Sequence, residues 1–246
     1  MENTNYMKKF NKYSFLILIL IATGCGIPSV HPLYEPGDLI TNDNLNGVWQ
    51  RSDGSIRFHV MQLSALKLHL LETEMQNAAI VQNIDGLGGD LAMDTDLGIV
   101  EYLEELEKEG RGKLYLIQYE SNPEDIYLGG LVELAGNHYF DLYKIDFGAS
   151  EFRYPVHLFM KSTISDSLLT MHSFSENWLK EQIKNRQIRI QVEVNIDDKF
   201  LITAPTRDLK KFVEKYGSIE EAYRHTQEYR KISSEPKFQF ELYDEE

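Results

Sequence analysis

Hydrophobic and polar residues alternate in short runs along most of the chain, which is the pattern of half-buried β-strands. Near the start, the runs Val48-Trp49 and 55–61 flank the turn signal Ser52-Asp53-Gly54, so together they predict a hairpin. The run 66–71 alternates in the same sense and predicts a further strand.

A meander of strands is predicted after residue 113, because alternating runs return there with turn signals between them. These five predicted strands cover 113–119, 126–134, 138–145, 156–164 and 167–174. Two shorter strands are expected at 188–194 and 199–203, joined by Asp197-Asp198. Strands at this spacing predict an antiparallel meander that forms a barrel or a sandwich.

Helical patterns interrupt and follow the strands, so the expected fold class is mainly β with α insertions. The helices are predicted near 99–109, 175–184 and 206–230. The first has apolar residues at helical spacing and ends at Gly110, and the second begins at the cap residue Ser175. The third begins at Thr206, and the capping box Ser218-Ile219-Glu220-Glu221 predicts its second part.

The N-terminal residues have the pattern of an export signal. Three lysines precede the apolar run 15–22, and Met7 is an alternative start to Met1. Eight apolar residues are too few to span a membrane, which needs about 20, and they fit the hydrophobic part of a signal peptide. Residues 1–24 are therefore predicted to be removed.

The run ends at Ala22-Thr23-Gly24-Cys25, which resembles the lipobox of bacterial lipoproteins, although Ala22 stands where Leu is usual. The resemblance implies that Cys25 is the lipid-attachment residue, with diacylglycerol on its sulfur, cleavage before it and an acyl chain such as palmitate on the new amino terminus. Gly26 rather than Asp follows Cys25, which in such lipoproteins favours the outer membrane of a cell that has one. The expected location is therefore the cell envelope.

Composition divides the remaining chain into three parts. Residues 25–44 contain Pro28, Pro32 and Pro36 and are predicted to be an extended tether that is not packed. The partial exceptions are Leu33-Tyr34 and Leu39-Ile40, which could dock on the domain. Residues 45–232 are predicted to form a single β-rich domain, with a long loop at 75–98. The tail 233–246 is expected to be a late strand or disordered.

Charge and cysteine content limit the partners. The net charge of −14 opposes binding to nucleic acid and does not attract the chain to anionic lipid. Cys25 is the only cysteine, so neither an internal disulfide nor a cysteine-based zinc site can form. Membrane attachment is thus expected through the lipid anchor.

No spacing of residues singles out a catalytic or metal site. The seven histidines are scattered, and Asp94 and Asp96 lack the remaining ligands of a calcium loop. A serine-nucleophile elbow and a phosphate-binding glycine loop are absent from the sequence. We therefore nominate no catalytic residue, metal or cofactor, and the ligand-binding residues stay unassigned.

Two resemblances bear on the domain. Leu45-x-Gly47-x-Trp49, after the lipobox and a Pro-Leu-Tyr segment, is similar to the opening of a group of uncharacterised bacterial lipoproteins. The segment 203–212, the strand with Pro155-x-His157-x-Phe159 and the helix with Trp178 fit the same group. The Gly47-x-Trp49 opening also resembles that of the lipocalins, which implies a barrel for small apolar ligands; the helix at 99–109 and the additional strands depart from that family.

The leading hypothesis is a non-enzymatic envelope lipoprotein that binds a small apolar ligand or an envelope protein. An envelope-acting hydrolase, for example on glycans, and a structural or assembly lipoprotein are the alternatives. A binding barrel predicts a closed apolar cavity, and an enzyme predicts an open cleft with converging titratable groups. An assembly protein predicts an exposed apolar patch or a free strand edge.

Overall fold

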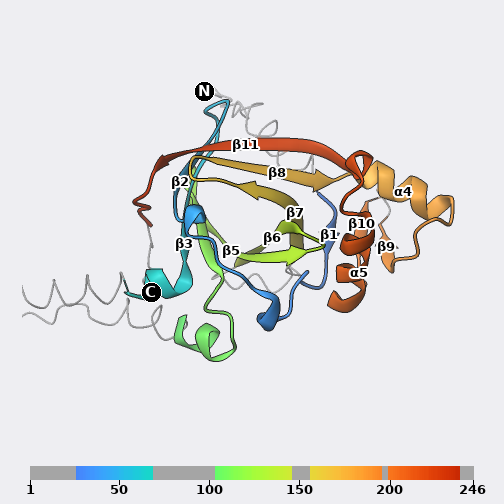
Figure 1. The fold of residues 1–246 in the computed structure, drawn as a ribbon, viewed down its shortest axis with the longest axis horizontal. Helices are drawn as coiled ribbons and strands as arrows, with labels where there is room; N and C mark the ends of the chain where they lie inside the picture. Colours follow the sequence, from blue (N-terminus) through green and yellow to red (C-terminus); the bar gives the residue numbers. More distant parts are fainter. Residues whose placement is uncertain (1–25, 69–102, 146–155, 196–198, 239–246) are drawn as a thin grey trace, which may run out of the picture.

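A closed antiparallel barrel forms the centre of the protein (Figure 1). The computed structural model describes residues 26–68, 103–145, 156–195 and 199–238. The barrel strands are β2 (Gly47–Arg51), β3 (Arg57–Gln62), β4 (Tyr115–Tyr119), β5 (Asn122–Leu134), β6 (Asn137–Ile145), β7 (His157–Ile164), β8 (Leu168–Phe174) and β11 (Tyr223–Ser233). Neighbours in the chain are neighbours in the barrel, and β11 pairs with both β8 and β2. The predicted mainly β fold is confirmed, and it is a barrel.

Alternation along the strands separates two hydrophobic cores. Residues directly opposite each other in an antiparallel pair point to the same face, and register pairs Trp49 with Phe58 and Leu131 with Phe140. These side chains fill the barrel interior, together with others of the same core: Leu45, Val60, Tyr115, Ile117, Met160, Leu169, Met171 and Tyr229. The intervening residues of β4 to β8 point outward into the second core.

One end of the barrel is closed by the residues that lead into β2. The 3-10 helix η2 (Asp43–Leu45) buries Leu45 completely, and the Trp49 indole N–H donates to the Leu45 carbonyl at 2.8 Å. Gly47 has a φ of +139°, and a Cβ there would lie 2.5 Å from the Ser233 carbonyl oxygen. The Gly47-x-Trp49 pattern therefore reflects a backbone turn that only glycine adopts without strain, directly before the buried indole.

The outer face of the barrel is covered by helices and by a short extension of the sheet. Strand β1 (Pro28–Ser29) pairs with β7, β10 (Phe200–Ile202) runs parallel to β1, and β9 (Val192–Val194) pairs with β10. The helices are α4 (Glu176–Lys184), α5 (Thr206–Tyr216) and the 3-10 helices η1 (Pro36–Asp38) and η3 (Glu220–Ala222), with further helical residues at 63–68 and 103–108. Their buried residues form the outer core against the barrel wall.

The expectation that residues 25–44 form an unpacked tether is wrong for the described residues 26–44, although the two segments expected to dock, Leu33-Tyr34 and Leu39-Ile40, do pack on the barrel. Ile27, Ser29, Leu33 and Leu39 are buried, and β1 is hydrogen-bonded into the sheet. Prolines in a polar stretch are typical of a linker, but in this segment they separate apolar residues that are buried in the outer core. We call residues 26–40 the strap, because they lie across the barrel wall.

Two predicted elements have a different secondary structure. Residues 223–233, expected to continue a helix, form the strand β11, and only the 3-10 turn η3 follows Gly217. The inward positions of β11 include Gln227, so its apolar alternation is too weak to indicate a strand. The predicted strand at 66–71 is helical over its described residues 66–68, because Leu63 and Leu66 are buried at helical spacing.

Other predictions are confirmed where the structure describes them. Helix 103–108 matches the described part of the helix predicted at 99–109, and the Ser175 hydroxyl accepts from the Trp178 N–H at the start of α4. The strand expected at 188–194 is shorter and covers only Val192–Val194. The loop 75–98 and residues 239–246 of the tail lie outside the described residues.

A glycine inside the barrel permits close packing and gives the first prediction. A Cβ at Gly129 would lie 2.4 Å from Phe140 Cζ and 2.8 Å from Ile117 Cδ1. We expect Gly129→Ala to lower the free energy of unfolding by about 1–3 kcal/mol, because the well-packed interior cannot accept another methyl group without strain. Gly37, where a Cβ would meet nothing within 4 Å, is the matched control. Urea unfolding followed by tryptophan fluorescence measures both variants, and equal midpoints would contradict the packing argument.

Candidate functional site

A small cavity lies in the barrel interior, on the side away from the closed end. Its volume is about 40 Å³. Nine residues from six strands line it: Phe58, Ile117, Tyr119, Phe140, Leu142, Met160, Met171, Gln227 and Tyr229. Small-molecule sites in proteins commonly have volumes of about 300–1,000 Å³. The cavity therefore has room for a group of the size of a few heavy atoms and not for a typical apolar ligand.

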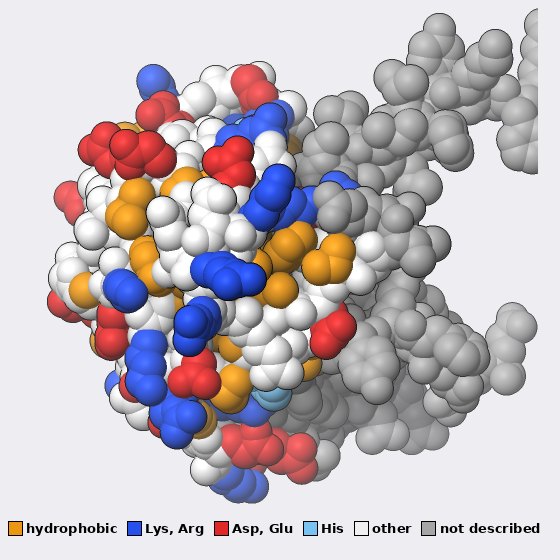
Figure 2. Space-filling view, turned by 90° about the vertical axis from the view of Figure 1, so that its right-hand side faces the viewer, with side chains coloured by type: hydrophobic (Ala, Val, Ile, Leu, Met, Phe, Trp, Pro, Cys, Tyr) orange, Lys and Arg blue, Asp and Glu red, His pale blue; other side chains and the backbone are white. Residues whose placement is uncertain are grey.

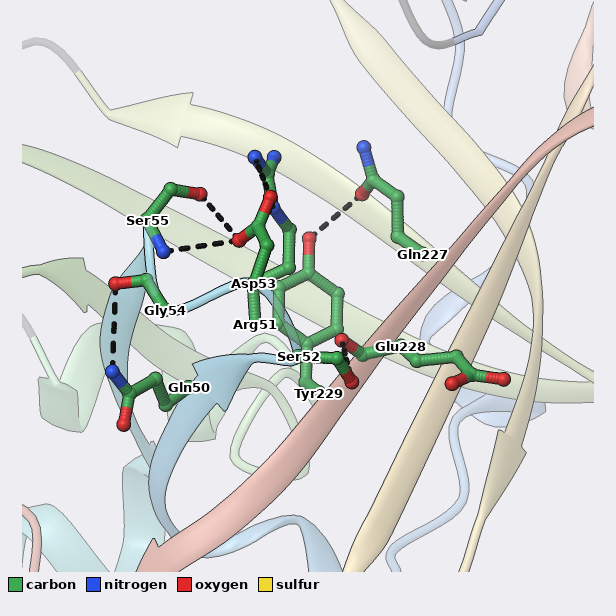
Figure 3. Close-up of polar contacts among 9 residues, drawn as sticks. All are labelled: Gln50, Arg51, Ser52, Asp53, Gly54, Ser55, Gln227, Glu228 and Tyr229. Carbon is green, nitrogen blue, oxygen red and sulfur yellow. Dashed lines mark hydrogen bonds and ion pairs between the residues drawn. The ribbon is translucent and has the colours of Figure 1, made fainter.

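Polar groups accompany this apolar lining. The Tyr229 hydroxyl donates to Gln227 Oε1 at 2.7 Å (Figure 3). Burial raises the pKa of Tyr119 well above its usual range, so its hydroxyl stays protonated at any physiological pH. Ser162 and Ser173 are buried opposite Met171 and Met160 in the register, and their hydroxyl oxygens have no hydrogen-bond partner among the described residues.

The hairpin between β2 and β3 stands at the open end, next to Tyr229 (Figure 3). The Arg51 guanidinium binds both carboxylate oxygens of Asp53, with nitrogen–oxygen distances of 2.7–2.9 Å. Asp53 also accepts from the backbone N–H and the hydroxyl of Ser55. These bonds, the one from Arg51 first, hold the pKa of Asp53 well below its usual range. The Arg51–Asp53 pair thus stabilises the turn, and each of its two charges is neutralised by the other.

A second polar cluster lies on the outside of the barrel, under the strap. Asp141 on β6 is 1% exposed, and its Oδ2 accepts from the Leu33 N–H at 2.6 Å. Its Oδ1 lies 2.9 Å from His157 Nδ1 on the neighbouring strand β7. The imidazole is stacked on Tyr143, with ring centroids 5.1 Å apart, and meets the edge of Tyr34.

Chemically, the Asp141–His157 pair can orient an imidazole, as a carboxylate does for a general base. The structure uses both carboxylate oxygens for another purpose. One oxygen fixes the strap through Leu33, and the other fixes a ring that packs between two tyrosines. We therefore interpret the cluster as a clamp that holds the strap on the barrel.

Cys25, the one site residue nominated from the sequence, lies just outside the described residues. Its neighbour Gly26 is described, and a Cβ there would lie 3.8 Å from Leu158 Cδ2 and 4.0 Å from Ser173 Cβ. Gly26 is thus in contact with the barrel at the open end.

Neither a metal cluster nor a membrane-crossing helix is found in the described part of the chain. No three His, Cys, Asp or Glu side chains converge there as metal ligands would, and none of its helices is long and apolar enough to cross a bilayer. Asp94 and Asp96 lie outside the described residues.

Sequence reasoning missed Gln227, Asp141 and His157. Gln227 lies in a segment interpreted as helix, so it was not placed in a barrel. Asp141 and His157 lie within correctly predicted strands, and a buried Asp at an outward position was the available signal. The burial of Asp141 is apparent only when the strap that covers it is known, so the residue pattern along one strand could not reveal it.

The clamp gives the second prediction. Asp141→Asn keeps one acceptor oxygen but removes the negative charge and the second acceptor oxygen, whereas the Leu33 N–H and the His157 ring each bind one oxygen of the carboxylate. We expect the free energy of unfolding to fall by about 1.5–3 kcal/mol, the range for hydrogen bonds to a charged group. Asp43→Asn, at an exposed position, is the control and should change it by less than about 0.5 kcal/mol. If urea unfolding gave equal losses for both variants, Asp141 would not be a clamp.

No match to this chain is found among protein-family models, curated proteins or solved structures. Its function is therefore argued from the geometry of the barrel and from its N-terminal sequence.

Proposed function

We propose that this chain is a lipid-anchored lipoprotein of the bacterial cell envelope whose barrel serves as a rigid, non-enzymatic module for binding a partner protein. The barrel presents its outer surface and its closed end for recognition. Its interior serves stability.

The observation that carries this proposal is the filled interior. Aromatic and aliphatic side chains occupy it and leave a cavity of about 40 Å³. A carrier of apolar ligands needs a much larger enclosed space. The absence of such a space among the described residues favours recognition at the surface over transport of a ligand inside.

The anchor is supported by the sequence before the barrel. The apolar run 15–22 and the Ala22-Thr23-Gly24-Cys25 end have the features of a lipoprotein signal. Several acyl chains on one residue bind a bilayer firmly, at roughly 0.8 kcal/mol for each buried CH₂ group. An anchor of this kind needs no membrane-spanning segment.

The second candidate is an envelope-acting hydrolase, and the observation in its favour is the Asp141–His157 pair. An oriented imidazole is one part of several hydrolytic sites. Against this candidate, His157 is stacked on Tyr143, and the carboxylate also binds the Leu33 backbone. The structural use of every group in the cluster favours the binding module.

Replacement of the nominated cysteine tests the anchor. Cys25→Ser removes the sulfur that would carry the lipid, so we expect the protein to leave the membrane fraction after a high-salt wash. Thr23→Ser keeps a small residue before Cys25 and should leave the protein in that fraction. Fractionation of the native host and immunoblotting measure both variants. A Cys25→Ser protein that stays in the washed membranes would show that the anchor is not a lipid on this residue.

The choice between a partner protein and an enclosed ligand is tested by native mass spectrometry. The protein is purified in detergent from its own host, and its mass is compared before and after denaturation. We expect protein complexes and a protomer mass without additional small molecules, because the cavity is too small for them. A stoichiometric mass increase of several hundred daltons that disappears on denaturation would point to a carrier instead.

A further inference from the structure

The packed strap begins at Gly26, one residue after the proposed anchor Cys25. A Cβ at Gly26 would lie 3.8 Å from Leu158 Cδ2 and 4.0 Å from Ser173 Cβ, so the strap is next to the barrel from its first described residue. A free stretch of 19 residues could have extended roughly 60 Å at about 3.3 Å per residue. Because that stretch is part of the sheet, a lipid on Cys25 would fix which side of the domain meets the membrane.

The residues around Gly26 form one rim of the molecule. Strand β1 pairs with β7, where Pro28 is opposite Leu158, and with β10, where Ser29 is opposite Ile202. Strand β10 pairs in turn with β9, where Phe200 is opposite Val194. Leu158 is 37% exposed, Val194 is 50% exposed, and Lys199 is also exposed. We call Gly26, Leu158, Val194 and Lys199 the anchor rim.

Charge on this side of the molecule differs from that of the whole chain. Residues 176–217 contain nine of the 25 Lys and Arg residues and seven of the 39 Asp and Glu residues. They carry a small positive charge in a chain with a net charge of −14. Seven of these cations are exposed: Lys184, Arg186, Arg189, Lys199, Arg207, Lys211 and Lys215. Figure 2 shows Lys and Arg side chains near the middle of this face, among hydrophobic ones, with Asp and Glu side chains around them.

We propose that the anchor rim rests on the lipid surface, with the cations of residues 176–217 facing anionic headgroups. This inference rests on the proposed lipid anchor at Cys25. It adds that the anchor is rigid, that Leu158 and Val194 lie at the acyl-headgroup boundary, and that the closed end of the barrel points away from the bilayer. Exposed apolar side chains beside cations are what an interfacial surface requires.

The test measures which end of the barrel lies near the lipid. The full chain is produced in lipidated form and reconstituted into phosphatidylglycerol vesicles that contain lipids with a nitroxide on the headgroup. Because Cys25 is the only cysteine and would be acylated, one introduced cysteine is the only free thiol for a fluorophore. Leu158→Cys and Val194→Cys label the anchor rim. Leu168→Cys and Ile232→Cys, which are 39% and 47% exposed, label the opposite end as matched controls.

We expect the two rim fluorophores to lose most of their fluorescence and the two controls to keep most of theirs. Equal quenching at all four positions would show a loosely tethered domain and overturn the inference while leaving the anchor intact. Stronger quenching at Leu168 and Ile232, or no quenching on vesicle-bound protein, would overturn it as well. Protein that does not sediment with the vesicles would overturn the anchor, and with it the inference.

A charge-reversal pair tests the contribution of the cations. Arg189→Glu with Lys199→Glu should reduce the quenching at Val194, because the reversed charges repel the anionic surface. Arg224→Glu with Arg230→Glu makes the same change in net charge at exposed positions of β11 and should leave the quenching unchanged. Equal effects of the two pairs would mean that total charge, and not the rim, sets the orientation.

Discussion

Closure of the barrel by β11 is the constraint on which the other features depend. This strand pairs with β8 along one side and with β2 along the other, so it satisfies both edges that a seven-strand sheet would leave open. Closure also brings Lys231 opposite Trp49, with its ammonium 5.0 Å from the indole ring. Burial lowers the pKa of Lys231, and the indole face compensates for part of the lost hydration. The first and last strands are thus joined by hydrogen bonds and by a side-chain contact.

Once the sheet is closed, its interior volume is fixed by the strand number, and the side chains have to fill it. An eight-strand barrel has an interior wide enough for side chains or one small ligand. This chain places rings at Trp49, Phe58, Tyr115 and Phe140 there, so little space remains. The outer core forms for a different reason: the outward residues of β4 to β8 are also apolar and have to be covered from water. The strap and the helices supply that cover, which is why a proline-containing segment is packed.

The sequence indicated the elements whose signals are local. The strands of the meander alternate cleanly and are separated by turn residues, so their positions could be predicted to within a few residues. The position of β11 could not be predicted, because its inward positions include the polar Gln227. Whether a polar side chain can face the interior depends on the residues of the opposite barrel wall. The docking of Leu33 and Leu39 could be expected from their apolar pairs, but the burial of Ile27 and Ser29 could not, because it depends on the barrel wall beneath them. The candidate site combines Gln227 with residues from five other strands, so no single segment could reveal it.

The net charge alone suggests that the protein is repelled by an anionic membrane, but the distribution of charge and the position of the strap also decide this. A net charge of −14 argues against attraction to an anionic membrane only if the charge is spread evenly over the surface. Screening limits each charge to about 8 Å at physiological salt, so a membrane responds to the side chains that face it and not to the total. Residues 176–217 carry nine Lys and Arg residues against seven Asp and Glu residues, whereas the rest of the chain carries 16 against 32. A packed strap makes this unevenness important, because a rigidly held domain presents one side to the membrane, whereas a freely rotating one would present the average.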